Sequence, residues 1–232
     1  MLRAEGLRHA FGSVRALDGI SFSLTAGRTL AVFGPNGAGK TTLLKVLGGL
    51  LRPQAGVARV EGGRRAIGWI GHQSHLYGHL TVRENLLFWA SLYGVPAAGR
   101  AARADAVLDR LGLADRAHQA VQALSRGLVQ RAAIARALAA EPEVLVLDEP
   151  VSALDPSVRE KVLQLLLRLQ RERELTMIFV SHDLDVVGAV ADEVLVMQDG
   201  VIVEQGAVTD VFAAPQHPFT RELLEANRPV SP

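Results

Sequence analysis

The chain carries the stretch Gly34-Pro35-Asn36-Gly37-Ala38-Gly39-Lys40-Thr41, which fits the pattern G-x-x-x-x-G-K-[ST]. The apolar run 29–33 precedes it, and residues 42–47 follow with helical character. A buried strand, a glycine-rich turn and a helix together let backbone N–H groups converge on an anion. The sequence therefore predicts a phosphate-binding loop between a strand and a helix.

The residues that close this loop each have a predicted role toward a nucleotide. Lys40 is expected to reach the β- and γ-phosphates, Thr41 to bind Mg²⁺, and Thr42 to lie near the α-phosphate. The alternative is a loop that only turns the chain. The choice of cation argues against it, because only Lys40, Lys45 and Lys161 are lysines among 25 basic residues. A compact ammonium suits a phosphate, so we expect a nucleotide and Mg²⁺ as cofactors.

Composition limits the remaining classes of protein. The chain has 232 residues, 49% of them hydrophobic, which predicts one large domain or a domain with an insertion. A formal net charge of +1 gives no indication of a basic surface that binds nucleic acid. The absence of cysteine excludes disulfides and thiolate metal sites. No apolar run approaches the ~18 residues of a membrane span and no signal core opens the chain, so we expect a soluble protein.

The hydrophobic pattern alternates between strands and helices. This predicts an α/β fold of the P-loop NTPase type, with a mostly parallel core sheet and an antiparallel β subdomain at the N-terminus. The whole of 1–232 is expected to form one domain, with a helical subdomain inserted at about 75–140 and C-terminal helices at about 207–227. Within the insertion, breaks are expected at 94–96 and 124–127. The predicted strands cover 2–8, 20–24, 58–61, 66–70, 144–147, 177–180, 194–198 and 201–205, and the other predicted helices cover 158–174, a segment after 182, 208–213 and 218–226.

A second nucleotide element follows the apolar run 144–147, which ends in Asp148 and Glu149. Ligands bind at the carboxyl edge of open α/β sheets, where a strand ending in an acid places its carboxylate. Asp148 is expected to hold the Mg²⁺ shell, and Glu149 to polarise a water in line with the γ-phosphate. The alternative is a strand end capped by two solvated acids.

At this point the chain resembles the ATP-binding-cassette (ABC) ATPases over nearly its whole length, because several separate motifs occur in that family's order. Phe11 occupies the position of the aromatic that stacks on adenine, and Gln73 that of the glutamine joining Mg²⁺ to the membrane-subunit interface. His182 matches the histidine that contacts the γ-phosphate. Two longer matches are the signature, Leu124-Ser125-Arg126-Gly127-Leu128, and the segment that crosses the dimer interface, Ser152-Ala153-Leu154-Asp155.

The resemblance implies a mechanism and a set of partners. Two cassettes, identical or paralogous, bind head to tail with ATP and Mg²⁺ between the phosphate loop of one and Ser125 and Gly127 of the other. Glu149 and His182 are implied as catalytic, and Thr41, Gln73 and Asp148 as the residues around the metal. Transmembrane permease subunits are the implied partners, which places the chain in the cytoplasm, peripheral on the inner face of the membrane.

The signature departs from the family pattern Leu-Ser-Gly-Gly-Gln at two positions. Arg126 replaces the first glycine and Leu128 the glutamine, while Ser125 and Gly127 are kept. We expect a working site, because the retained residues carry the implied phosphate contacts. Arg126 has two open readings: it either adds positive charge near the phosphates and tightens ATP binding, or points to solvent.

The two halves of the chain resemble different subfamilies. Residues 69–73 and 80–86 are similar to the ATPase of the cytochrome c biogenesis haem exporter. Residues 151–155, 181–187 and 216–224 resemble dipeptide, oligopeptide and nickel importer ATPases. Docking in the family resides mainly around Gln73 and the helical subdomain, so we favour an exporter-type partner over an importer. Three further functions stay open: a cassette ATPase not coupled to transport, a P-loop kinase, and a cassette with degenerate hydrolysis.

The aromatic residues are unevenly distributed along the chain. Both tryptophans and both tyrosines fall between residues 69 and 93, together with Phe88. We expect Phe88 and Tyr93 to fill the small core of the helical subdomain. Tyr77, in an expected loop near Gln73, is the better candidate for a groove that receives a helix of the membrane subunit.

Overall fold

A computed structural model describes residues 1–71, 73–152 and 154–227, with the side chains of residues 64 and 65 left aside. His72 and Ala153, each part of a motif named above, lie outside the described residues. Within the described chain, no helix is both long and apolar enough to cross a membrane.

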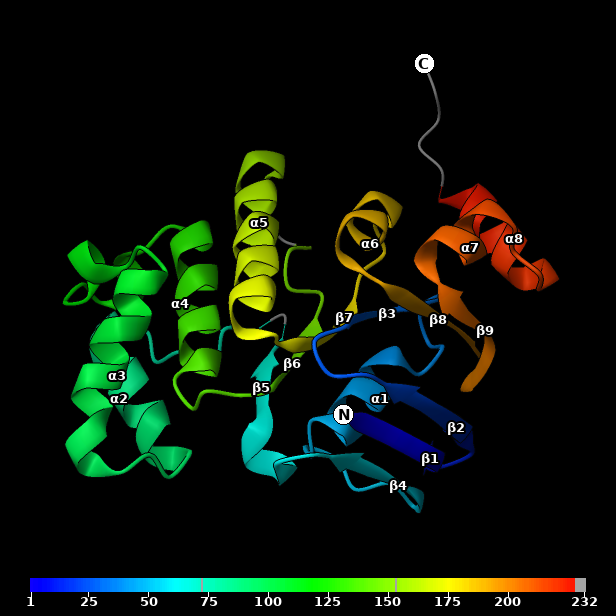
Figure 1. The fold of residues 1–232 in the computed structure, drawn as a ribbon, viewed down its shortest axis with the longest axis horizontal. Coiled ribbons are helices and arrows are strands. Elements are labelled where there is room, and N and C mark those ends of the chain that lie inside the picture. Colours follow the sequence, from blue (N-terminus) through cyan, green and yellow to red (C-terminus); the bar gives the residue numbers. More distant parts are fainter. Residues whose placement is uncertain (72, 153, 228–232) are drawn as a thin grey trace.

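A six-stranded sheet forms the centre of the molecule (Figure 1). Its strand order is β5-β6-β7-β3-β8-β9, in which the first five strands are parallel and β9 runs antiparallel to β8. Every residue of the adjacent strands β6, β7 and β3 is buried, as expected of a parallel sheet covered on both faces. The bounds are β3 Thr29–Phe33, β5 Ile67–Ile70, β6 Val144–Asp148, β7 Thr176–Val180, β8 Glu193–Gln198 and β9 Val201–Ala207.

A second, antiparallel sheet is built from the N-terminal segment. Its order is β2-β1-β4, with bounds β1 Leu2–Phe11, β2 Val14–Leu24 and β4 Ala55–Val60. Both β2 and β4 pair with β1. The predicted α/β class, with an N-terminal antiparallel sheet and a mostly parallel core sheet, is therefore confirmed.

Two hydrophobic cores lie on opposite faces of the central sheet. Alternate residues of a strand point to opposite faces, so Leu30 and Val32 of β3 join one core while Ala31 and Phe33 join the other. The first core is closed by helix α1 (Lys40–Leu47) and the antiparallel sheet. The second is closed by α5 (Pro156–Arg173), α6 (Leu184–Val190) and α7 (Val208–Ala213), which lie above the sheet in Figure 1.

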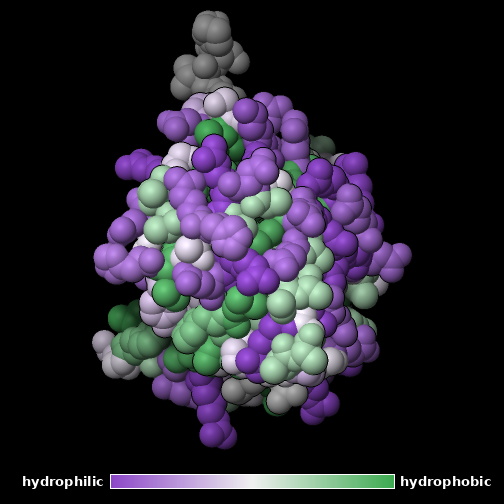
Figure 2. All heavy atoms as spheres, turned by 90° about the vertical axis from the view of Figure 1, so that its left-hand side faces the viewer, coloured by the Kyte–Doolittle hydropathy of each residue, from purple (hydrophilic) through white to green (hydrophobic). Residues whose placement is uncertain are grey.

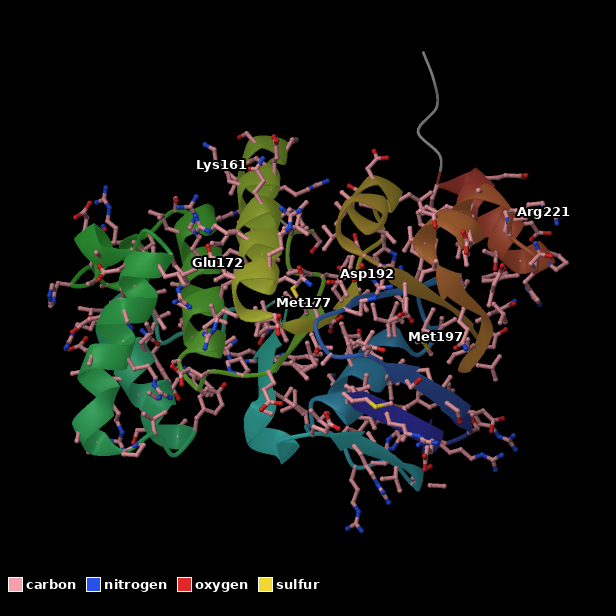
Figure 3. The ribbon with its side chains drawn as sticks, viewed as in Figure 1. Lys161, Glu172, Met177, Asp192, Met197 and Arg221 are labelled. Carbon is pink, nitrogen blue, oxygen red and sulfur yellow. The ribbon has the colours of Figure 1, made fainter. Side chains whose placement is uncertain are left out.

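Asp192 fixes the start of β3 to the strand beside it. The backbone N–H of Thr29 donates to Asp192 Oδ2 at 2.7 Å, and Arg28 Nη1 donates to Asp192 Oδ1 at 3.0 Å. Asp192 lies immediately before β8 and is labelled in Figure 3. These contacts set the register of β3, which ends at the phosphate loop.

Three helices lie together at one end of the molecule, in green at the left of Figure 1. They are α2 (Val82–Leu92), α3 (Ala97–Arg110) and α4 (Arg126–Leu138), and all fall within the predicted range 75–140. A capping box begins α2: Glu84 N–H donates to Thr81 Oγ1, and the backbone N–H of Thr81 donates to the Glu84 carboxylate. That this region forms a subdomain of its own stays a prediction.

The predicted break at 124–127 is correct for Leu124 and Ser125 only. Ser125 is the N-cap of α4, so Arg126 and Gly127 already lie inside the helix. The helical pattern is interrupted earlier by two short 3₁₀ turns, 114–116 and 121–123. The C-terminal helices α7 and α8 (Pro218–Ala226) have the bounds that the sequence predicts.

Candidate nucleotide-binding and catalytic site

The phosphate loop lies close to the backbone of one strand from each sheet. A Cβ at Gly34 would lie 2.3 Å from the carbonyl oxygen of Met197 in β8, a residue labelled in Figure 3. A Cβ at Gly39 would lie 2.1 Å from the carbonyl oxygen of Ala16 in β2, and Gly39 has a φ of 98° as the N-cap of α1. Only glycine fits at these two positions, and both hold the loop at the N-terminus of a helix.

Lys40 opens α1 and folds back along the loop. Its Nζ donates to the carbonyl oxygens of Gly34 and Pro35, each at 2.8 Å, and the side chain is almost fully buried. Burial lowers the pKa of the Lys40 ammonium, while the carboxylates of Glu149 and Asp148 raise it in opposition. The ammonium therefore lies among oxygen atoms at the centre of the loop, where phosphate oxygens can replace the carbonyls.

Thr41 and Asp148 bring two hard oxygen donors together. The Thr41 hydroxyl donates to Asp148 Oδ1 at 3.3 Å, across the junction of α1 and β6. Among the described residues, no group of three or more His, Cys, Asp or Glu side chains could hold a metal ion. Mg²⁺ on a nucleotide does not need one, because it keeps several waters and takes one or two protein oxygens besides the phosphates. These two residues fit that role.

Glu149 and His182 form a direct pair at the next strand ends. His182 Nε2 lies 2.7 Å from Glu149 Oε1, and both side chains are partly exposed. Glu149 has a φ of 52°, a left-handed conformation that is uncommon outside glycine and concentrates at functional sites. The pair lines a hollow of about 420 Å³. The turn after β6 thus presents this carboxylate to the histidine and to the hollow.

The loop that carries His182 is held in place by the next residue, Asp183. Asp183 Oδ1 accepts from the N–H groups of Asp185 and Val186 and so caps α6, while Asp183 Oδ2 accepts from Arg159 Nη1 at 2.9 Å. Arg159 lies in the first turn of α5. Sequence analysis missed this residue, because a lone arginine in a helix carries no motif that distinguishes it from a solvated one.

Phe11 and Gln73 both have side chains at the surface. Phe11 ends β1 with 55% of its area exposed, and its ring meets His9 edge-on at 4.7 Å between centroids. An exposed ring of this kind has a free face on which a base can stack. Gln73 is exposed in the loop after β5. Adenine stacking by Phe11 and the metal role of Gln73 stay predictions.

The signature residues lie on a different part of the molecule. Ser125 is exposed at the N-terminus of α4 and makes no side-chain hydrogen bond to the helix end. Gly127 lies in the first turn, where a Cβ would come 2.6 Å from Val158 Cγ1. Figure 1 shows α4 and α1 well apart, on either side of β5 and β6. Within one chain, the structure does not bring the signature to the phosphate loop.

Comparisons with known proteins identify the family. The model of the family described as ABC transporter matches residues 17–152, which is more than half of the chain. The chain belongs to the ABC transporter family. It is the ATP-binding subunit of such a transporter, and the subunits of this kind hydrolyse ATP to drive transport, so the predicted ATPase class is confirmed.

Individual relatives agree with this assignment. The methionine import ATP-binding protein MetN of Mesorhizobium japonicum is 40% identical over 100% of this chain and 67% of its own length. The structure of cbiO1 from Clostridium perfringens has a TM-score of 0.83 and 32% identity, covering 92% of this chain and 90% of that one. The cassette MJ0796 bound to ADP and phosphate has a TM-score of 0.78 and 28% identity, covering 90% and 99%. The chain spans about two thirds of the length of the curated relatives it matches.

Two predictions need correction. The preference for a haem-exporter type, and with it the role in cytochrome c biogenesis, is not supported, because the matching relatives are named as methionine import proteins. The exporter-like segments 69–73 and 80–86 are too short to decide a subfamily. The prediction that Phe88 fills a core is wrong as well, because its ring is 38% exposed. The helical period turns Phe88 outward, while Val82, Leu86 and Ala90 face inward.

The close approach of the phosphate loop to these backbones leads to a first prediction. We expect Gly39→Ala to lower the free energy of unfolding by about 3 kcal/mol or more, because the new Cβ meets a backbone oxygen that cannot move freely. Gly37→Ala is the matched control: Gly37 also has a positive φ, of 84°, but its Cβ would meet nothing within 4 Å. It should cost only ~1–2 kcal/mol of backbone strain. Thermal and urea unfolding without nucleotide would measure both free energies. An equal decrease in the two variants would contradict the close contact of Gly39 with the Ala16 carbonyl.

Proposed function

We propose that the chain is the ATP-hydrolysing subunit of an importer that carries an amino acid, with methionine as the first substrate to test. The observation that carries the proposal is the 40% identity over the whole chain with a protein named for methionine import. It is proposed to act as a pair of cassettes beneath transmembrane permease subunits, peripheral on the inner face of the membrane. The relative cbiO1 is described as part of a transporter complex and MJ0796 as dimeric, in agreement with these partners.

The geometry supports a division of labour within each cassette. Lys40 and the N-terminus of α1 are proposed to bind the β- and γ-phosphates. Thr41 and Asp148 are proposed to hold Mg²⁺, which neutralises charge on the phosphate oxygens when bound. Phe11 is proposed to stack on the adenine. The donors present are oxygen atoms and an ammonium, which suit a magnesium nucleotide.

Glu149 is proposed as the base that accepts a proton from the attacking water. Its Oε1 is engaged by His182 Nε2 at 2.7 Å, which orients the carboxylate and leaves Oε2 for the water. His182 is in turn proposed to contact the γ-phosphate. The pair lies next to Lys40 and Asp148, because β3, β6 and β7 are adjacent parallel strands that end at one edge.

A second cassette is proposed to complete the site. The Ser125 hydroxyl makes no capping bond to its own helix, unlike Thr81 at the start of α2 and Asp183 at the start of α6. It is therefore available, with the first N–H groups of α4, to a phosphate held by the partner cassette. Arg126 lies in the same turn, which contains no acidic residue.

The permease is proposed to dock beside Gln73. Tyr77, Phe88 and Leu92 are 51%, 38% and 61% exposed, and the first two rings meet edge-on at 5.0 Å between centroids. Figure 2 looks onto this side of the molecule and shows hydrophobic side chains gathered in areas between hydrophilic ones. Exposed apolar rings next to a nucleotide-linked loop suit a helix from the membrane subunit.

Glu149→Gln tests the catalytic assignment. The amide keeps the shape but cannot accept the proton, so we expect the rate of phosphate release to fall by a factor of about 10² or more. ATP should still bind, and a dimer should accumulate with ATP and Mg²⁺ in size-exclusion chromatography. Glu160→Gln, a change of another exposed acid on α5, is the control and should keep the wild-type rate. Near wild-type turnover of Glu149→Gln would overturn the assignment.

Ser125→Ala tests the site across the dimer. Removing a hydroxyl aimed at the partner's γ-phosphate should lower turnover about 10-fold and leave ATP affinity of the isolated chain nearly unchanged. The measurements are steady-state phosphate release and calorimetric ATP binding. An unchanged rate would show that the signature does not contact nucleotide.

The substrate and the partner are tested in one reconstitution. The chain is co-expressed with candidate permease subunits of amino-acid, peptide and exporter types, and ATPase activity is measured in each complex that forms. We expect assembly with an amino-acid importer permease and a rate that responds to methionine. Phe88→Asp should weaken assembly, because it places a charge in the apolar docking face, whereas Val14→Asp on the antiparallel sheet should not. Assembly only with an exporter subunit would reject the importer proposal.

A further inference from the structure

The end of helix α4 holds a buried cation that the proposed function does not use. Arg136 lies in the last turn of α4 and is 2% exposed. Its Nη2 donates to the carbonyl oxygen of Trp69 at 2.7 Å, and its Nη1 lies 3.5 Å from the Tyr93 hydroxyl. Its guanidinium carbon lies 5.1 Å from the centroid of the Trp89 ring, within the range of a cation–π contact.

Stability alone does not explain this arginine. Within the described part of the chain, no acidic side chain forms an ion pair with Arg136, and its buried Nε has no hydrogen-bond partner. Burial lowers the pKa of the guanidinium, because an apolar environment disfavours the charged form, while Tyr93 raises it in opposition. An apolar side chain of similar volume often stabilises a protein as well as a buried ion does, or better. A costly buried group of this kind calls for another role.

The partners of Arg136 bracket the loop that carries Gln73. Trp69 lies in β5, just before the loop, and its carbonyl oxygen is held by Arg136. After the loop, the carbonyl oxygen of His75 accepts a hydrogen bond from Trp89 Nε1 at 3.1 Å, and the Trp89 ring is the one that Arg136 covers. The guanidinium thus binds residue 69 directly and is linked to residue 75 through the Trp89 ring.

This cluster also touches the elements that bind nucleotide and the proposed permease face. Gly48 is the C-cap of α1, and a Cβ there would lie 2.9 Å from the Trp69 ring, so Trp69 packs directly on the end of the phosphate-loop helix. On the other side, the Trp89 ring lies 5.9 Å from Phe88, whose ring meets Tyr77. The aromatic series from Trp89 to Tyr77 leads from the buried cation to the surface.

Helix α4 connects this cluster to the signature. The helix runs without interruption from the N-cap Ser125 to Leu138, and the rise per residue places Arg136 about 16 Å from Ser125. The helix packs against both β5 and α2. A displacement at either end of such a rigid element moves the other end with it.

We propose that Arg136 is a positioning residue that fastens the Gln73 loop to the signature helix, so that binding of nucleotide in one part of the cassette and contact with the permease in another act on α4 together. The proposal rests on the proposed ATPase function. The planar guanidinium of Arg136 is essential to this role, because it binds a carbonyl oxygen and covers an aromatic ring at the same time. A lysine ammonium cannot do both equally well.

Three variants of the full chain test the role. Arg136→Met removes the charge at similar volume, Arg136→Lys keeps the charge without the fork, and Trp89→Phe keeps the ring but loses the N–H that binds His75. Arg100→Lys is the matched control, since Arg100 also donates to a backbone carbonyl, that of Val95 at 2.7 Å, but on α3, away from the loop. Each variant is measured for thermal unfolding, ATP affinity and steady-state ATPase kinetics.

We expect kcat to fall about 10-fold or more in Arg136→Met and Arg136→Lys, since small misplacements of catalytic groups have effects of this size. KM for ATP should change by less than about threefold, because the phosphate loop itself is intact. Arg136→Met should unfold at or above the wild-type temperature. If Arg136→Met yields no folded protein, Arg136→Lys and Trp89→Phe decide the matter, and the latter should lower kcat at an unchanged unfolding temperature.

Tryptophan fluorescence gives a direct readout of the cluster. Trp69 and Trp89 are the two tryptophans of the chain; Arg136 binds the backbone carbonyl of Trp69 and lies over the ring of Trp89. In a Glu149→Gln background, ATP with Mg²⁺ should change the emission of the parent protein and of Arg100→Lys. The same addition should leave the emission of Arg136→Met unchanged, although calorimetry shows ATP bound.

The outcomes separate this inference from the function on which it rests. A wild-type chain no faster than Lys40→Ala in hydrolysis would reject the ATPase proposal, and the inference with it. A wild-type chain that hydrolyses ATP, while all three variants match it in kcat and in emission change, overturns the positioning role alone. A loss of activity in proportion to the loss of folded protein overturns it too, because that is the mark of a purely structural residue.

Discussion

The site depends on one steric constraint, the close approach of the phosphate loop to the backbones on either side of it. Gly34 faces the Met197 carbonyl of β8, and Gly39 faces the Ala16 carbonyl of β2. The loop is therefore fixed at one end by the central sheet and at the other by the antiparallel sheet. Because α1 follows at once, this double contact also fixes where the helix N-terminus points, and with it the place of Lys40.

Parallel strands then bring the other groups to the same edge. The adjacent strands β6, β7 and β3 each carry functional groups at their carboxyl ends. Strand β6 ends at Asp148, next to Glu149; β7 is followed by the loop with His182; and β3 is followed by the phosphate loop. Groups that are far apart in the sequence meet at this edge, since all three carboxyl ends lie side by side. The short contacts from Thr41 to Asp148 and from His182 to Glu149 are consequences of this arrangement.

The sequence predicts this half of the molecule well, because buried parallel strands are continuous apolar runs and the motifs stand at their ends. It predicts β1 and β2 less well, because both extend beyond the expected segments 2–8 and 20–24. In β2 the added residues include Arg15 and Asp18, which interrupt the apolar pattern. It places Phe88 in a core where the helix turns it outward. It does not detect Arg136 or Arg159, because their roles come from contacts with residues far away in the sequence, which no local pattern records.

The signature at the start of α4 lies too far from the phosphate loop to act on it within one chain. Ser125 and the first turn of α4 face outward without a capping bond, and α4 lies across β5 and β6 from α1. A helix N-terminus whose hydroxyl is uncommitted is a poor feature of an isolated domain, since it adds an exposed positive end without stabilising the helix. It becomes useful when another molecule supplies a phosphate. The helix that bears it also ends at Arg136, which binds the carbonyl oxygen of Trp69 just before the Gln73 loop. If a partner cassette closes on Ser125 as proposed, its contact and the Gln73 loop are linked by one continuous helix.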